Sequence, residues 1–321
     1  MRPKLGKFEL HAAEMLRALR GGRSQRAFAH KLGYRANPIT DWEHGRRFPT
    51  AEEALRAAQI VRIDLARSFT LFHPTPPPID RTGRISLAPW LNALRGTTSV
   101  THLAQRTGRS RTAVARWLNG TAHPRLPDFL RCVDAITGRL SDLIAALVPI
   151  ESVPSLLSYH LSTLAARRLA FEQPWTEAVL RVLETKTYQA LQTHVDGLIA
   201  ARLEIPLETE QECLASLTRA AIITLEDGIW HEKKPLTVNT RSARDDLTLV
   251  LQHWTEVARR RISERRSRDL YAYNVMSVSV ADYERIRDLL RRTFREIQSI
   301  VAASEPSERV ALLNLQLLGF D

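Results

Sequence analysis

Two stretches of the chain hold polar side chains that can bond to nucleic-acid bases and phosphates. In residues 35–47 these side chains are Arg35, Asn37, Thr40, Asp41, His44, Arg46 and Arg47. In residues 109–119 they are Arg109, Ser110, Arg111, Thr112, Arg116 and Asn119. Asparagine and arginine can each make paired hydrogen bonds to one base edge, on adenine and guanine respectively, and arginines also hold phosphates. Both stretches are therefore candidate contacts to double-stranded DNA.

The residues of the first stretch differ in the chemistry they can offer. Arg46 and Arg47 suit phosphate contacts, whereas Asn37 suits base readout. Asp41 is repelled by phosphate unless it accepts from a cytosine amine or fixes a neighbouring arginine, and both alternatives stay open. The alternative for any single member is a solvated surface side chain.

Catalytic and metal-binding patterns are not found in the sequence. It contains no P-loop, GxSxG or HExxH motif, and its two cysteines, Cys132 and Cys213, have no ligand spacing around them. His194 beside Asp196 is the only pair worth inspecting, and a loop cap is the expected role. We therefore expect no enzyme activity, no catalytic residues, no cofactor and no metal.

Charge is distributed unevenly along the 321 residues. The net charge is +11, but residues 1–150 hold 24 Lys and Arg against 11 Asp and Glu, while the remaining residues hold 22 against 24. A basic half predicts a polyanionic partner. The longest uncharged apolar run, residues 143–150, is far shorter than a membrane span of about 20 residues. We expect a cytoplasmic, nucleoid-associated protein without a membrane partner.

The two candidate stretches belong to an internal repeat with an offset of 75 residues. Residues 16–65 align with residues 91–140 without a gap. The alignment pairs Leu16 with Leu91, Arg20 with Arg95, Ser24 with Ser99, Gly33 with Gly108, Trp42 with Trp117, Gly45 with Gly120 and Pro49 with Pro124. Each copy predicts a helix, a glycine turn, a helix opened by serine, and a third short helix over residues 37–44 in copy one. Trp42 and Trp117 are expected to be packing residues rather than sites.

This order of elements predicts a helix-turn-helix unit, whose third helix lies in the major groove. The segment from Ser24-Gln25 through Phe28-Ala29, Leu32-Gly33 and Ile39–Arg47 to Pro49 resembles the phage-repressor (Cro/CI, XRE-type) DNA-binding family. The resemblance implies that Gln25 helps to hold the DNA backbone. Copy two departs from the family pattern, with Val100 in place of glutamine and Leu118 in place of glutamate. We expect one helix-turn-helix domain over residues 8–70, a proline-rich linker over 71–85 and a second helix-turn-helix domain over 86–148.

The second half of the chain has a different pattern. Helices over residues 195–203 and 209–219 precede a hairpin with its turn at Asp227-Gly228, which predicts a helical and winged-helix-like domain over residues 149–240. Its second helix is acidic, with Glu208, Glu210 and Glu212, and would be repelled by phosphate. The basic run Arg259–Arg261, Arg265, Arg266 and Arg268 is read either as a solvated helix end or as an auxiliary backbone contact.

The last residues predict a strand, a helix and a strand. Residues 270–280 and 309–320 alternate in hydropathy, and residues 281–303 have helical spacing, which favours a small α/β sandwich over residues 241–321. This end also resembles the carboxy-terminal domain of uncharacterised bacterial proteins in which it follows a repressor-like helix-turn-helix. The expected fold class is thus mainly α: two tandem helix-turn-helix modules, a winged-helix-like unit and the α/β sandwich.

These observations predict a sequence-specific transcriptional regulator that reads DNA with residues 1–150. The second half would serve dimerisation or the sensing of an unidentified effector. The alternative is a protein-interaction adaptor, antitoxin-like or phage-related, whose repeats hold a protein partner instead of DNA.

Overall fold

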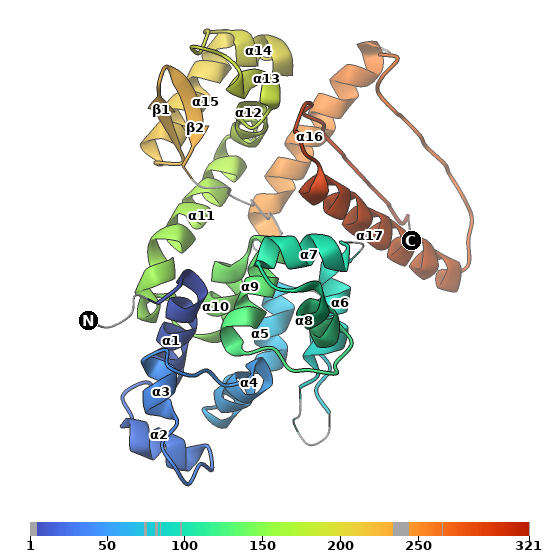
Figure 1. Ribbon diagram of the computed structural model, residues 1–321. Helices are drawn as coiled ribbons and strands as arrows, with labels where there is room; N and C mark the ends of the chain where they lie inside the picture. Colours follow the sequence, from blue (N-terminus) through green and yellow to red (C-terminus); the bar gives the residue numbers. More distant parts are fainter. Residues whose placement is uncertain are drawn as a thin grey trace. The chain divides into compact units, whose positions relative to one another are not determined.

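The computed structural model of the chain describes residues 5–73, 76–80, 83, 85–96, 98–233, 244–264 and 266–320. It divides into two compact units, residues 1–161 and 162–321, which we describe one at a time. Within the described residues the protein is mainly helical, with one small two-stranded sheet (Figure 1). The predicted class, mainly α, is confirmed.

The first repeat copy forms five helices, and its serine, threonine and aspartate residues start three of them. Ser24 and Asp64 each accept a hydrogen bond from the backbone N–H three residues on, and Thr50 and Glu53 form a reciprocal capping box. Gly21 ends the first helix with φ of +61°, a conformation that glycine adopts without strain. The helices are α1 (Lys7–Arg20), α2 (Gln25–Lys31), α3 (Ile39–Glu43), α4 (Ala51–Ile60) and α5 (Leu65–Phe72).

The second copy repeats this order of helices. Ser99 and Ser110 cap the helices that follow them, by accepting from the backbone N–H groups of His102 and Ala113. The helices are α6 (Leu87–Arg95), α7 (Val100–Thr107), α8 (Arg111–Leu118), α9 (Leu126–Thr137) and α10 (Leu140–Leu147). The repeat inferred from the sequence is therefore visible in the positions of the helices.

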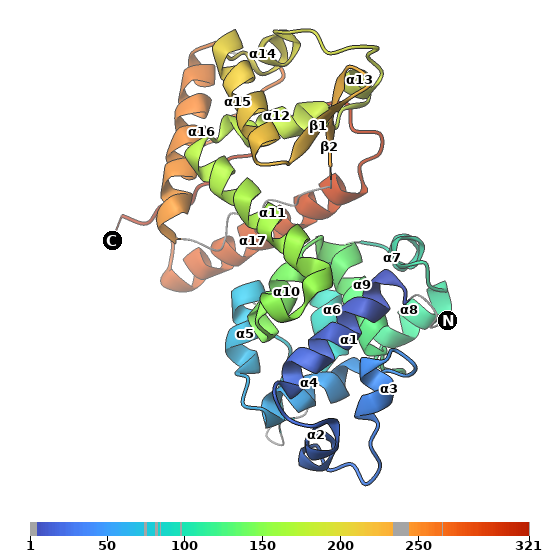
Figure 2. The same ribbon diagram turned by 90° about the vertical axis from the view of Figure 1, so that its left-hand side faces the viewer.

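Both copies contribute to one hydrophobic core. The Trp90 ring lies edge-on to Phe69 with 5.0 Å between centroids and also lies 6.0 Å from Phe129, and all three side chains are buried. Helix α5 lies beside α10 (Figure 1), and α1 lies beside α9 (Figure 2). Residues 8–70, 71–85 and 86–148, which we expected to form two domains and a linker, thus fall in a single compact unit. The reason is that each copy buries apolar surface against the other.

The second unit consists of helices and one hairpin. Helix α11 (Pro154–Glu172) begins in the first unit and ends in the second, after the 3₁₀ turn η1 (Ile150–Ser152). The elements that follow are α12 (Trp175–Leu183), α13 (Lys186–Gln189), α14 (Leu198–Leu203), α15 (Leu207–Arg219), β1 (Ile223–Glu226), β2 (Ile229–Glu232), α16 (Arg244–Glu264) and α17 (Val280–Ala303).

The predicted hairpin in the second unit is confirmed. Strands β1 and β2 are antiparallel, and Glu226 pairs with Ile229 across a two-residue loop. Both loop residues have positive φ, +50° at Asp227 and +83° at Gly228, as the Asp-Gly sequence favours. The order helix, helix, hairpin over α14, α15, β1 and β2 agrees with the predicted order of elements.

The prediction of an α/β sandwich at the chain end is wrong, because its two strands are not formed. Helix α17 forms, but residues 270–279 and 304–320 form no strand. Alternation of apolar residues suits a strand, yet a strand also needs a neighbour for its backbone hydrogen bonds. Among the described residues, neither segment pairs with another strand.

In the part of the chain that the structure describes, no helix is both long enough and apolar enough to cross a bilayer.

Candidate nucleic-acid interface

The short helix α3 is held by two buried apolar side chains. Ile39 and Trp42 face the core, and Trp42 lies edge-on to Tyr34 with 5.5 Å between ring centroids. Trp42 is therefore a packing residue, as expected, while Trp117 in copy two is half-buried. The helix is shorter than the predicted range 37–44, so Asn37 and His44 flank it at either end.

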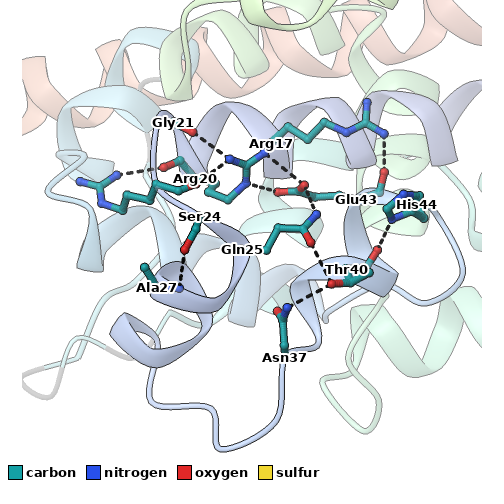
Figure 3. Close-up of polar contacts among 11 residues, drawn as sticks. Arg17, Arg20, Gly21, Ser24, Gln25, Ala27, Asn37, Thr40, Glu43 and His44 are labelled. Atoms are coloured by element: carbon teal, nitrogen blue, oxygen red, sulfur yellow. Dashed lines mark hydrogen bonds and ion pairs between the residues drawn. The ribbon is translucent and has the colours of Figure 1, made fainter.

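A chain of hydrogen bonds connects α1, α2 and α3 (Figure 3). Glu43, only 3% exposed, accepts from Arg20 Nε at 2.5 Å and from Gln25 Nε2 at 2.7 Å. Gln25 Oε1 in turn accepts from Thr40 Oγ1 at 2.9 Å, and Asn37 Nδ2 donates to Thr40 Oγ1 at 3.1 Å. Gln25, Asn37 and Thr40 are thus brought together and oriented by a buried carboxylate.

Sequence reasoning missed Glu43 and Arg20 as members of this group. The available signal was the position of Glu43 four residues after Ile39, which puts both on one face of a helix. A carboxylate on a buried face needs a charged partner, and Arg20 is that partner.

The side chains at the open face of copy one are exposed or half-buried. Arg35, Asn37, His44, Arg46 and Arg47 are exposed, and Thr40 and Asp41 are half-buried. Asp41 Oδ1 lies 2.8 Å from Arg46 Nε, so the arginine-fixing role is the one seen here. His44 Nδ1 lies 2.6 Å from the Thr40 carbonyl, which can only accept, so Nδ1 donates this hydrogen bond.

Copy two presents a different set of side chains around α8. Arg111, Thr112, Arg116 and Asn119 are exposed. Ser110 is the N-cap of α8, and Arg109 forms an ion pair with Asp128, with 2.7 Å between Nε and Oδ1. Ser110 and Arg109 are therefore exposed but also make contacts that stabilise the fold.

Several contacts that support the third helix recur in both copies. Arg17 donates to the backbone carbonyl of Glu43, and Asn92, its equivalent 75 residues on, donates to that of Leu118 at 2.6 Å. Likewise Arg20 Nη1 donates to the Arg23 carbonyl, and Arg95 Nη1 to the Thr98 carbonyl, both at 2.6 Å. The scaffold is therefore shared.

The polar centre of copy one has no counterpart in copy two. Val100 stands at the position of Gln25, and Leu118, 5% exposed, stands at that of Glu43. An apolar pair thus replaces the hydrogen-bonded pair, so α7 and α8 are joined by packing rather than by a carboxylate.

In the second unit, the acidic helix α15 uses one of its glutamates internally. Glu210 is fully buried and accepts from the backbone N–H groups of Gly197 at 3.1 Å and Ala200 at 2.5 Å, at the start of α14. His194 Nδ1 lies 3.1 Å from the Tyr188 hydroxyl, and its Nε2 lies 3.4 Å from Glu210 and 3.6 Å from Asp196. These contacts hold the loop before α14 in place.

The basic run at the end of α16 and just beyond it is largely paired with acidic side chains. Arg259 bonds to Glu256, Arg261 lies 3.5 Å from Glu204, and Arg266 contacts Glu204 and Glu264. Arg265 lies outside the described residues. The ion pairs favour a structural role for this run over a phosphate contact.

Comparison with known protein families shows a match in the second half of the chain. Residues 160–319 match a family described as a domain of unknown function (DUF4423), and the match covers nearly all of the second unit. No curated protein and no solved structure matches the chain. The matched residues do not include the candidate interface.

Proposed function

We propose that the protein is a sequence-specific DNA-binding regulator of transcription that uses its two repeat copies as tandem helix-turn-helix modules. The observation that carries the proposal is the open face of α3 and α8. There, exposed arginine and amide side chains lie on α8 or directly beside α3 and α8, short helices whose other faces are buried. Base edges are read by such side chains, and phosphates by arginines beside them.

Rigid support of these side chains favours readout over a merely solvated surface. Asn37 and Gln25 are fixed through Thr40 and Glu43, so little side-chain entropy remains to be lost on binding. The net charge of +13 in residues 1–150 favours a polyanionic partner and would draw the protein to DNA at low salt.

The experiment is capture of fragmented genomic DNA by the full-length protein, followed by sequencing over a salt series. A regulator enriches a defined site that persists as salt rises. Uniform, salt-labile capture would mean that only charge is at work, and no capture at moderate salt would favour the protein-interaction adaptor.

A matched pair of variants makes this capture decisive. The first replaces Arg46, Arg47, Arg111 and Arg116 by alanine, and the control replaces four exposed arginines of the second unit, Arg219, Arg268, Arg285 and Arg292. Both variants lose the same formal charge. The proposal requires that only the first variant loses the site.

For the second unit we propose assembly with a second copy of the chain, with effector sensing as the other role open to it. Leu270, Tyr273 and Val275 are 94%, 94% and 86% exposed, on an irregular segment rich in strand-forming residues. The same segment of a second copy could pair with it antiparallel about a two-fold axis and supply the missing backbone partners.

Sedimentation of the full chain tests this assignment. Tyr273→Lys with Val275→Lys should shift the protein toward monomer, because lysines on an edge oppose pairing. Lysines at two exposed positions of α15, Gln211 and Ala215, are the control for added charge. A protein that is monomeric before substitution would refute assembly by this segment.

A further inference from the structure

The contact between the two copies is reciprocal in its backbone hydrogen bonds. The Ala51 N–H donates to the Pro124 carbonyl at 2.9 Å, and the Leu126 N–H donates to the Pro49 carbonyl at 2.9 Å. Shifting either bond by the 75-residue repeat converts it into the other. Thr50 and Arg125, which are equivalent positions, form an antiparallel bridge at the centre.

The helices around this bridge follow the same relation. Helix α5 packs against α10, and their ranges, Leu65–Phe72 and Leu140–Leu147, are equivalent in the repeat. Helices α4 and α9 begin at the equivalent residues Ala51 and Leu126 and also contact each other. In these two pairs each helix therefore meets its own counterpart.

Reciprocal contact of this kind distinguishes a rotation from a translation. If residue i of one copy meets residue j of the other, and j meets i in return, the copies are related by a two-fold axis. Copies stacked by translation would bring different surfaces together instead. The axis here passes between Thr50 and Arg125.

We infer that one chain reads two half-sites in inverted orientation, with their centre of symmetry opposite the Thr50–Arg125 bridge. This rests on the proposed DNA-binding function and specifies its target. When a two-fold axis relates two DNA-reading helices, the half-sites they contact run in opposite directions along the duplex. The palindromic operators of symmetric dimers show the same relation. A single polypeptide thus takes the place of a dimer at one such site.

The two half-sites should differ in base sequence. In the repeat alignment Arg35 corresponds to Ser110, Asn37 to Thr112, Asp41 to Arg116 and His44 to Asn119. None of these four positions has the same residue type in both copies. Different side chains select different bases. The target is consequently inverted in geometry but not palindromic in sequence.

Tethered cleavage of DNA by the full-length protein tests the orientation. Lys31 and Arg106 are equivalent, exposed positions on α2 and α7, and each is replaced by cysteine in turn and labelled with an iron chelate. The native thiols of Cys132 and Cys213 are buried, and burial raises their pKa to about 12 and about 11, so the label is confined to the new cysteine.

The expected cuts of the two labelled proteins on the captured site are mirror images about one dyad, with the strands exchanged. Cuts related by a shift along the same strand would overturn the inference, as would cutting by the Lys31 label alone. Both outcomes leave DNA binding intact. Failure to capture any preferred DNA would instead refute the proposed function.

Reversal of one half-site in the DNA gives a second, independent readout. With the centre-to-centre distance kept, the reversed site should bind at least about 10-fold more weakly, since several base contacts of one copy are lost. Equal or tighter binding to the reversed, direct arrangement would overturn the inference.

Discussion

Glu43 accepts a hydrogen bond from Arg20 at 2.5 Å while it is almost completely shielded from water. The carboxylate lies on α3 and the guanidinium on α1, so the pair fixes the third helix of copy one against the first. The same carboxylate holds Gln25 of α2. One buried charge thus positions all three helices that carry the candidate interface.

Replacement of Glu43 by alanine should destabilise the first unit strongly. It leaves Arg20 and Gln25 without their acceptor, which we expect to lower the free energy of unfolding by about 2–4 kcal/mol. Urea unfolding measures the loss, and alanine at the exposed Glu151 is the control, with an expected change within about 0.5 kcal/mol. The double change Gln25→Val and Glu43→Leu, the pair present in copy two, should be tolerated better than Glu43→Ala. A double variant that is less stable than Glu43→Ala would contradict this account.

Arg46 and Arg47 should affect binding to all DNA sequences alike. Alanine at each position is expected to weaken binding and to reduce the slope of log K against log salt by about one per lost phosphate contact. Arg46 is already paired with Asp41, so Arg47→Ala should have the larger effect. Titration of the captured site and of an unrelated duplex at several salt concentrations measures both slopes. An unchanged slope would remove the residue from the phosphate contacts.

Asn37 and Arg111 should instead affect base preference. Alanine at either position is expected to cost about 1–3 kcal/mol on the preferred site, with much less effect on an unrelated duplex, because a paired contact to one base is lost. Competition with sites altered at single base pairs shows which position is relaxed. The two variants should relax different half-sites, and a preference that stays the same in both would count against this readout.

The stability of the first unit should fall as the pH drops from about 6.5 to about 4. His11 is 2% exposed, and burial lowers its pKa to about 4, with Lys7 as a second cause. Its Nδ1 lies 2.7 Å from Ser155 Oγ, which also bonds to Glu14. The unfolded chain binds a proton at this histidine near pH 6.5, whereas the folded chain does not bind it until about pH 4. The free energy of unfolding is therefore lower by about 3 kcal/mol at pH 4, and it is unaffected above pH 7.

Unfolding of His11→Gln at pH 7 and at pH 4.5 measures this contribution. The glutamine can still bond to Ser155 but cannot take up a proton, so the difference between the two pH values should shrink. Exposed His30→Gln is the control that should keep it. A pH dependence that is the same in His11→Gln as in the original protein would rule out His11 as its source.

Local features could be predicted from the sequence because they depend on neighbours along the chain. The caps at Ser24 and Ser99 involve N–H groups only three residues away, and the hairpin at Asp227-Gly228 depends on positive φ at two adjacent residues. The repeat at an offset of 75 residues was likewise visible in residue types alone. Mainly helical structure followed from these patterns and is confirmed.

Features that join distant parts of the chain were decided only by the tertiary structure. Residue types alone could not tell whether Asp41 bonds to a base or fixes Arg46, or that Glu43 is buried. They also left open whether the two copies are related by rotation, which the bonds between residues 49–51 and 124–126 show. Residues 270–279 have the composition of a strand, but pairing requires a partner that composition does not supply. The physical reason is common to these cases: burial and hydrogen bonding between remote residues depend on which surfaces meet, and that is a property of the whole fold.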